Sequence, residues 1–395
     1  MKNKEFKKGV AIGVAATLVV TGAGFVSYQK VLFPKGNALS DVKTVQKLNY
    51  LEELVDTEYL DEKDESSLRE GLYAGLLAGL KDPYSTYYTA EQYKELNTSN
   101  EGSYVGIGAV LQKDNDGGAT VVQLYEGGPG EQAGLKTGDV IKAIDGTDVT
   151  EKETSDIASM VRDSEKDSVT LTIQRENEEK TQDIKVEIRD VEIKTVSHEM
   201  LSGDTGYIRI SEFSEVTSDQ YKKAFADLKS QGMKKLVVDL RDNPGGLLNT
   251  VCDILRQILP EGLIVYTEDK NGKREEETCD GKNELDIPLA VLVNGNSASA
   301  SEIFAGAVKD YGIGTIVGTT TYGKGVVQTI QPLTDGSAVK ITIAKYFTPK
   351  GNDINKKGIT PDVEAELSGD ITDWAELTHE EDTQLQTALK ELEQN

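Results

Sequence analysis

The chain has few of the residues on which most hydrolytic enzymes depend. Its 395 residues include two histidines, two cysteines and one tryptophan. His198 lies near no glycine-rich turn, and His379 lies in an acidic run. A Ser-His-Asp triad is defined by geometry, so this scarcity argues against one without excluding it. Cys252 and Cys279 are accompanied by no C-x-x-C or H-E-x-x-H spacing, so we expect no metal site and no cofactor.

Basic residues are also in short supply. The chain has 43 lysines and arginines against 68 acidic residues, a net charge of −25. A body this acidic repels nucleic acid, and no basic patch with interleaved aromatics is present. Its hydrophobic content of 37% is ordinary for globular protein, and the length allows two or three domains. We therefore expect a multidomain globular protein with no nucleic-acid partner.

The N-terminus (residues 1–30) differs from the rest. It contains five lysines and one glutamate, and Gly9 to Gln29 carries no charge. This run has roughly the 20 residues that a helix needs to cross a bilayer. The preceding lysines predict a cytoplasmic N-terminus and an exported body. We expect a single-pass membrane anchor, although small residues at Thr21 to Gly24 also allow a cleaved signal peptide and a secreted protein.

Outside the cytoplasm the two cysteines have two possible states. Cys252 and Cys279 form a disulfide if their Cα atoms lie within bonding distance, and otherwise remain buried thiols. The sequence favours neither state.

Residues 38–100 predict a helical arm. Leucines and valines recur there at intervals of three and four residues. Such an apolar face packs against the rest of the chain or against a second copy, and we expect a homodimer. Asp82-Pro83 ends the second helix. Four tyrosines follow and are expected to pack together: Tyr84, Tyr87, Tyr88 and Tyr93.

Short strands replace helices from Gly102. We expect one strand over Tyr104 to Leu111, another over Thr120 to Leu124, a helix over Ser155 to Arg162 and a strand over Val169 to Ile173. With Ala-Gly-Leu-Lys-Thr-Gly-Asp-Val-Ile at 133–141, residues 103–190 resemble a PDZ domain. In that family a glycine-containing loop holds a peptide's terminal carboxylate, and the peptide adds a strand to the sheet edge. The resemblance implies that the loop is Gly106, Ile107 and Gly108, and that the peptide pairs with Ala109, Val110 and Leu111.

Strands and helices alternate over residues 191–366, which predicts an α/β layer. The expected strands are 206–210, 235–240, 263–267 and 289–293; the expected helices are 217–230 and 302–309; a hairpin follows at 325–333 and 338–347. Residues 367–395 read as an acidic, solvated tail with a short polar helix at 382–392.

Two segments of this layer offer a nucleophile and a base. Ser297, Ser299 and Ser301 lie where a strand gives way to a helix, the setting of a nucleophile elbow. Spacing does not choose among them, and helix capping accounts for at least one. Lys324 lies among valines, and burial lowers the pKa of a lysine toward the range of a general base. Gly245 and Gly246 allow backbone N–H groups close to a substrate.

Two other readings use the same residues. Gly318 to Lys324 fits the P-loop pattern G-x-x-x-x-G-K, but Gly325 stands where an NTPase needs Ser or Thr to hold Mg²⁺. The second alternative is a membrane-anchored PDZ scaffold whose protease fold has lost activity.

A family resemblance selects among these readings. Five segments carry it: Asp239 to Gly246, Ser297 to Glu302, Thr321 to Gly325, Tyr346 to Gly351 and Gly358 to Asp362. They resemble the carboxy-terminal processing peptidases of family S41, also called tail-specific proteases, which are PDZ-bearing serine proteases with a Ser-Lys dyad. Tyr322 departs from the phenylalanine often found in that family.

The resemblance implies a role for each matching residue. Ser299 is the nucleophile, Lys324 the general base and Gln328 the residue that orients the lysine, while the backbone N–H groups of Gly245 and Ala300 form the oxyanion hole. It also implies protein or peptide substrates with free C-terminal tails. The expected fold class is α/β multidomain: an anchor, a helical arm, a PDZ-like β-rich domain, an α/β protease core and a C-terminal helical tail.

Overall fold

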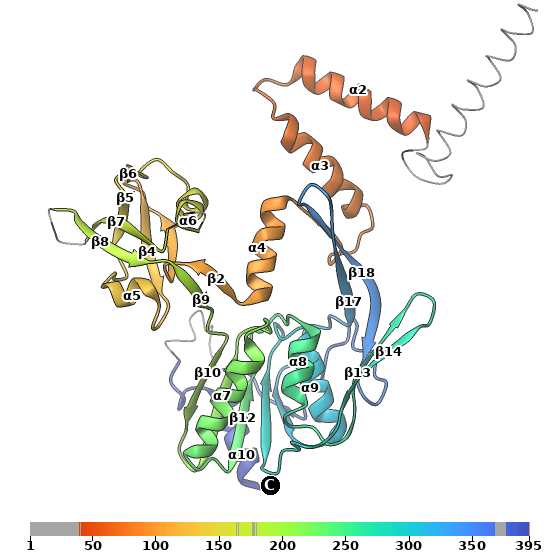
Figure 1. The fold of residues 1–395 in the computed structure, drawn as a ribbon. Helices are drawn as coiled ribbons and strands as arrows, with labels where there is room; N and C mark the ends of the chain where they lie inside the picture. Colours follow the sequence, from red (N-terminus) through yellow and green to blue (C-terminus); the bar gives the residue numbers. More distant parts are fainter. Residues whose placement is uncertain are drawn as a thin grey trace, which may run out of the picture. The chain divides into compact units, whose positions relative to one another are not determined.

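A computed structural model describes residues 39, 41–162, 164, 166–175, 178, 180–367 and 377–394 (Figure 1). The predicted anchor, Gly9 to Gln29, lies outside these residues. Within the described ranges, no helix is both long enough and apolar enough to cross a membrane. Two compact units are distinguished, residues 1–76 and residues 77–395.

The described part of the first unit is helical. Helix α2 (Val42–Glu58) begins at Asp41, whose side chain accepts a hydrogen bond from the Lys43 N–H, and α3 (Glu65–Ala78) follows. Neither helix has a buried residue. A groove of about 260 Å³ lies between them. The predicted arm is therefore present as two helices with an open apolar groove.

The arm was expected to be helical as far as residue 100, but a strand interrupts it. β1 (Thr86–Tyr88) pairs with a distant strand, and α4 (Ala90–Glu101) follows, capped by Thr89 and ended by Gly102 in the left-handed conformation. The four tyrosines do not form one cluster: Tyr87 is buried in β1, whereas Tyr84 lies beside Lys324.

The expected PDZ region forms a sheet in the order β3-β4-β5-β7-β8, with β6 paired to β5. Its strands are β3 (Ala109–Lys113), β4 (Ala119–Leu124), β5 (Val140–Ile144), β6 (Thr147–Asp148), β7 (Ser168–Gln174) and β8 (Gln182–Glu187), with α5 (Pro129–Ala133) and α6 (Thr154–Arg162). Thirteen buried residues make its own core. A separate pair, β2 (Ser103–Gly106) with β9 (Arg189–Glu192), carries the chain into and out of this domain.

One strand prediction here is wrong. Residues 104–111 were expected to form a single strand, but the chain turns at Ile107 and Gly108. Ile107 is buried in the domain core, and Gly108 has φ +71°, a value that interrupts an extended strand. β2 and β3 therefore belong to different sheets.

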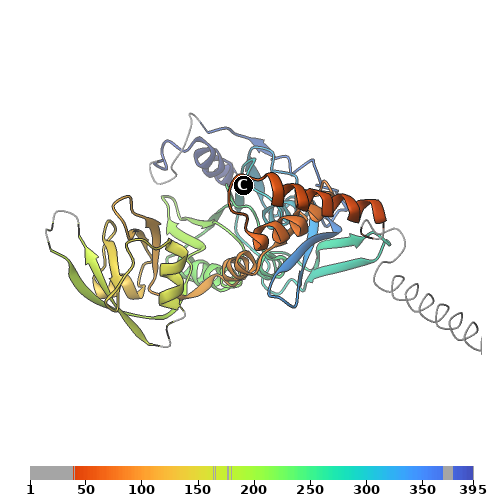
Figure 2. The same cartoon turned by 90° about the horizontal axis from the view of Figure 1, so that it is seen from above.

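The core sheet has six strands in the order β10-β11-β12-β15-β16-β19. They are β10 (Val196–Met200), β11 (Thr205–Ile210), β12 (Lys235–Asp239), β15 (Leu289–Val293), β16 (Thr315–Gly318) and β19 (Val363–Glu364), parallel except for β10. Alternate side chains point to opposite faces, so each face has its own apolar layer. One face packs against α7 (Thr217–Ser230), α8 (Leu248–Leu255) and α9 (Ala300–Tyr311), and the other packs against α10 (Thr383–Gln394). Figure 2 shows α10 on the opposite side of the sheet from α7.

A second, five-stranded sheet supplies the rest of the core. Its strands are β1, β13 (Gly262–Asp269), β14 (Arg274–Cys279), β17 (Val326–Pro332) and β18 (Ala338–Phe347). The hairpin predicted at 325–347 corresponds to β17 and β18. Its partner β1 was not predicted.

The expectation of a solvated tail is wrong for residues 382–392. Leu385, Ala388 and Leu392 are buried against the core sheet, and Asp382 is only 4% exposed. The reason is a buried cation: Arg241 is 1% exposed and is held by Asp239 on one side and Asp382 on the other. Burying a guanidinium is costly unless carboxylates pair with it. Cys252 and Cys279 are both buried and free.

Candidate active site

Three loops meet at one edge of the core sheet. Residues 240–247 follow β12, residues 294–299 follow β15 and residues 319–325 follow β16. These strands are parallel, so their carboxyl ends lie at the same edge, which is where open α/β sheets place their sites. The predicted nucleophile, base and glycine pair are thereby brought together from three segments of the chain.

Hydrogen bonds between the loops fix their positions. Asp242 and Asn294 bond each other through the Asp242 N–H and the Asn294 amide. The Ala298 N–H donates to the Asn243 carbonyl, and the Tyr322 N–H donates to the Ser297 carbonyl. The three loops therefore form one connected structure rather than three independent turns.

The structure distinguishes the three serines that spacing could not. The Ser297 hydroxyl donates to the Leu240 carbonyl and the Ser301 hydroxyl donates to the Asn243 carbonyl; both residues are fully buried. Ser299 is half-buried and lines a cavity of about 290 Å³. It has φ +56° and ψ −112°, a conformation that a residue with a side chain rarely adopts. A strained serine at the start of α9 has the geometry of a nucleophile elbow.

The Glu302 carboxylate joins the turn at Ser299 to the loop that carries Lys324 (residues 319–325) through hydrogen bonds. Its carboxylate is fully buried and accepts hydrogen bonds from the N–H groups of Ser299, Gly323 and Lys324 and from the Thr321 hydroxyl. Four donors compensate for burying the charge. The sequence showed Glu302 only as part of a motif, because three of its four partners lie 19 to 22 residues away.

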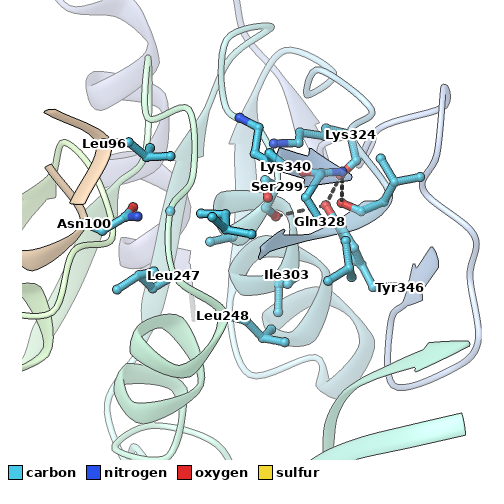
Figure 3. Close-up of a pocket in the computed structure, with 15 residues that line it drawn as sticks. Leu96, Asn100, Leu247, Leu248, Ser299, Ile303, Lys324, Gln328, Lys340 and Tyr346 are labelled. Atoms are coloured by element: carbon cyan, nitrogen blue, oxygen red, sulfur yellow. Dashed lines mark hydrogen bonds between the residues drawn. The ribbon is translucent and has the colours of Figure 1, made fainter. Parts of the chain in front are cut away.

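Tyr346 makes a second connection between the same two segments. Its hydroxyl contacts the carbonyl oxygens of Ser299 and Lys324 (Figure 3). The residue is 2% exposed, and burial, followed by the charge of Glu302, raises its pKa well above the usual value. The hydroxyl therefore remains protonated and able to donate.

Lys324 lies in the same cavity as Ser299. Burial is the largest influence on its ammonium and lowers its pKa; the charge of Lys340 acts in the same direction, and Glu302 opposes both. Its Nζ lies 5.1 Å from the centre of the Tyr84 ring. A lysine whose pKa is lowered in this way is more readily available as a base near neutral pH.

Gln328 shares the cavity with the lysine, but its hydrogen bonds go elsewhere among the described residues. Its amide nitrogen donates to the Val326 carbonyl and the Thr342 hydroxyl. For the residues that the structure describes, no hydrogen bond joins Gln328 to Lys324, or Ser299 Oγ to Lys324 Nζ. The expected orienting role of Gln328 therefore stays a prediction.

The two glycines of the 240–247 loop differ in what their N–H groups do. The Gly245 N–H donates to Asn243 Oδ1 at 2.8 Å, and its expected oxyanion role stays a prediction. The Gly246 N–H has no acceptor among the described residues, and Gly246 lines the cavity together with Ala300. Gly245 instead provides space, because a Cβ there would lie 2.7 Å from the Ser299 Cβ.

The P-loop reading is not supported by the structure. The segment Gly318 to Lys324 follows β16 but leads into β17, whereas a P-loop opens a helix whose N-terminus holds phosphate. Across the described ranges, no group of three or more His, Cys, Asp or Glu side chains is arranged to hold a metal ion.

Three of the predicted peptide-binding residues, Ala109, Val110 and Leu111, lie at one edge of the PDZ-like sheet. β3 pairs with β4 alone among the described strands, so its other edge is open to an added strand. The Ile107 and Gly108 carbonyls accept hydrogen bonds from Gly130 and Tyr125, which fixes the loop before β3. Gly106 ends β2, while Ala109, Val110 and Leu111 belong to β3.

Family models match along most of the chain. The model of peptidase family S41 matches residues 204–365, that of the PDZ domain matches residues 120–175, and that of the N-terminal domain of the activating protease CtpB matches residues 20–92.

Individual relatives agree with these matches. A probable CtpA-like serine protease of Staphylococcus aureus (strain N315) is 37% identical over 362 residues, which cover 90% of this chain and 71% of the relative. The solved photosystem II D1 C-terminal processing protease is 32% identical, with 84% of this chain and 90% of that chain covered and a TM-score of 0.48. A putative S41 protease from Bacteroides fragilis, 19% identical with a TM-score of 0.51 and coverage of 85% and 92%, has a similar fold. The chain belongs to peptidase family S41 and is a serine protease with a PDZ domain.

Proposed function

We propose that this protease cleaves proteins near or from their C-terminal tails, with Ser299 as the nucleophile and Lys324 as the general base. One observation carries the proposal: Ser299, in a strained turn, and Lys324, with a lowered pKa, line one cavity and are fastened together by Glu302. This arrangement has no evident purpose in an inactive scaffold.

The reaction follows from these positions. Ser299 Oγ attacks the carbonyl carbon of the scissile peptide bond while its proton passes to the neutral Lys324 Nζ. The tetrahedral intermediate collapses, the C–N bond breaks, and the Lys324 ammonium returns the proton to the leaving amine. Water then attacks the acyl-enzyme ester and gives a proton to Lys324, and the second product leaves as Ser299 regains its hydrogen.

The oxyanion requires donors aimed into the cavity. We assign Ala300 as one of them, because the first N–H groups of a helix have no acceptor within it. Gly246 replaces Gly245 as the second, since its N–H is unused and the residue lines the cavity. We assign Gln328, which lines the same cavity, to orient Lys324, as the family resemblance implies.

Substitution tests the dyad. Ser299→Ala and Lys324→Ala should each abolish cleavage of an unfolded reporter protein, and a fluorophosphonate probe should label the wild-type enzyme but not the Ser299→Ala variant. Ser297→Ala and Ser301→Ala are the matched controls: each loses a buried hydrogen bond, worth about 1–3 kcal/mol, yet should keep turnover. Retained activity in a folded Ser299→Ala or Lys324→Ala variant contradicts the proposal.

The PDZ domain supports the proposed choice of C-terminal tails. The open edge of β3 and the fixed loop before it suit a peptide that ends in a free carboxylate. Amidating the C-terminus of a substrate should raise KM about tenfold with little change in kcat. An unchanged KM contradicts carboxylate capture.

The groove of the helical arm supports a homodimer. Leucines and a valine line it, and several are well exposed, including Leu51 at 47% and Leu72 at 56%. Exposed apolar surface of this kind marks an interaction site. Leu51→Glu with Leu72→Glu should convert a dimer to a monomer in light scattering, whereas a wild-type monomer refutes the dimer.

The composition of the N-terminus supports a membrane-anchored enzyme. Gly9 to Gln29 would anchor the chain and place the protease outside the cytoplasm. Protease added to intact cells should digest the body of the protein but spare the lysine-rich N-terminus.

A further inference from the structure

A second lysine lines the cavity that holds Ser299 and Lys324. Lys340 lies on β18, where it is paired in register with Thr86 of β1 and Ile330 of β17. It is half-buried. Figure 3 shows its side chain beside that of Lys324.

Lys340 has no counter-ion among the described residues. Its Nζ lies 5.2 Å from the centre of the Tyr88 ring, within range of a cation–π contact. On the same strand, Lys345 does have a carboxylate partner, Asp353 at 3.6 Å. The chain has 68 acidic residues against 43 basic ones, so a lysine left unpaired inside a cavity is unusual for this composition.

Few charges act on Lys324 besides Lys340. From α9 it faces Glu302, whose two oxygens already accept four hydrogen bonds. From the segment before β1 it faces Tyr84, and Tyr346 on β18 contacts its carbonyl. Burial raises the pKa of both tyrosines, so they are neutral over the working pH range.

We propose that Lys340 acts through Lys324: its positive charge disfavours a second ammonium in the same cavity and so keeps Lys324 as the neutral amine that accepts the Ser299 proton. The inference rests on the proposed role of Lys324 as base. Lys340 neither donates nor accepts a proton in the reaction and makes no bond to substrate. It is a positioning residue that sets the pH range of the protease.

The test is the pH dependence of kcat/KM between pH 6 and 10 on an unstructured reporter peptide without acidic residues. Removing the Lys340 charge raises the pKa of Lys324, so a smaller fraction of the enzyme has a neutral amine at pH 7. In Lys340→Gln and Lys340→Met, kcat/KM should fall about tenfold at pH 7, which corresponds to a rise of about one unit in the pKa of Lys324. Near pH 9, kcat/KM of both variants should approach the wild-type value. Lys340→Arg keeps the charge and should keep the wild-type profile.

Lys345→Gln is the matched control, because it removes the same charge from the same strand at a position paired with Asp353. Its profile should equal that of the wild type. Circular dichroism and thermal melting establish that every variant is folded.

Three results overturn the proposal. An equal loss at every pH in Lys340→Gln indicates a structural role, and a loss confined to peptides with an acidic residue beside the scissile bond indicates substrate recognition. All three are distinct from failure of the proposed dyad: an unaltered Lys340→Gln profile with inactive Ser299→Ala and Lys324→Ala variants refutes only the inference about Lys340.

Discussion

The loop that carries Ser299 (residues 294–299) and the edge strand β3 of the PDZ domain differ in how far their polar groups are paired. Around Ser299, backbone and carboxylate groups are paired with one another, with Glu302 alone accepting four hydrogen bonds. Along β3, one whole edge of the strand has no partner in the described chain. Chemistry at one bond requires fixed groups, whereas recognition of a peptide main chain requires free ones. Within one protein, the groups around Ser299 are hydrogen-bonded to one another, whereas the outer edge of β3 has unpaired backbone groups.

The largest effect is expected where the loop network is anchored. Asp382→Ala removes two charge-assisted hydrogen bonds from buried Arg241 while Asp239 stays in place, which should lower the free energy of unfolding by roughly 3–5 kcal/mol. Urea denaturation measures this. Glu380→Ala, an exposed neighbour, should change stability little. Equal stability of the two variants would show that Asp382 is not needed to hold buried Arg241.

The next effect concerns turnover. Glu302→Gln preserves shape but directs an NH₂ group at donors, so the Ser299 turn and the Lys324 loop should separate. We expect kcat to fall about 100-fold, since displacements near 1 Å have that consequence. Steady-state kinetics on the reporter peptide measures it, and a kcat near the wild-type value in a folded variant would show that Glu302 does not hold the two segments together.

A smaller effect is expected in the PDZ domain. Gly108 has φ +71°, and a Cβ there would lie 3.0 Å from Pro129 Cδ. Gly108→Ala should distort the loop before β3 and raise KM for tail substrates about tenfold, with kcat unchanged. Gly146→Ala, at φ +78° with open space around it, is the control for backbone strain alone. Equal KM values in the two variants would separate the loop from tail recognition.

The smallest effect should come from Tyr346→Phe. It removes one hydrogen-bonding hydroxyl while Glu302 continues to hold the same two segments. A net hydrogen bond is worth about 1 kcal/mol, so kcat should fall roughly fivefold. A loss as large as that of Glu302→Gln would give the tyrosine a more direct part in the reaction.

The sequence predicted the α/β layer well because its signals are local. The helix at 217–230 and the fully buried strand at 289–293 are found with the predicted bounds. Short apolar runs bounded by turn residues suffice for such predictions. The choice of nucleophile required the structure. The hydroxyls of Ser297 and Ser301 donate to carbonyl oxygens more than fifty residues away along the chain, and that of Ser299 does not, among the described residues.

For other site residues, the sequence gave no sign that they lie near Lys324. Tyr84, Lys340 and Tyr346 reach Lys324 from segments far away along the chain, through strand pairing that periodicity does not specify. The break at Gly108 was expected from the PDZ resemblance but not from the apolar pattern, because a positive φ cannot be read from an apolar run. Asp382 was taken for a solvated residue since nothing near it in sequence shows that Arg241 needs a second carboxylate.

The pairing of Arg241 with Asp382 has a consequence for the order of events during synthesis. The two residues are 141 positions apart. During synthesis, the loops that carry Ser299 and Lys324 are made before residue 382. At that stage Arg241 has Asp239 beside it but not yet Asp382. Arg241 therefore receives its second carboxylate only after α10 has been translated, so the C-terminal helix completes a part of the core that was begun 141 residues earlier.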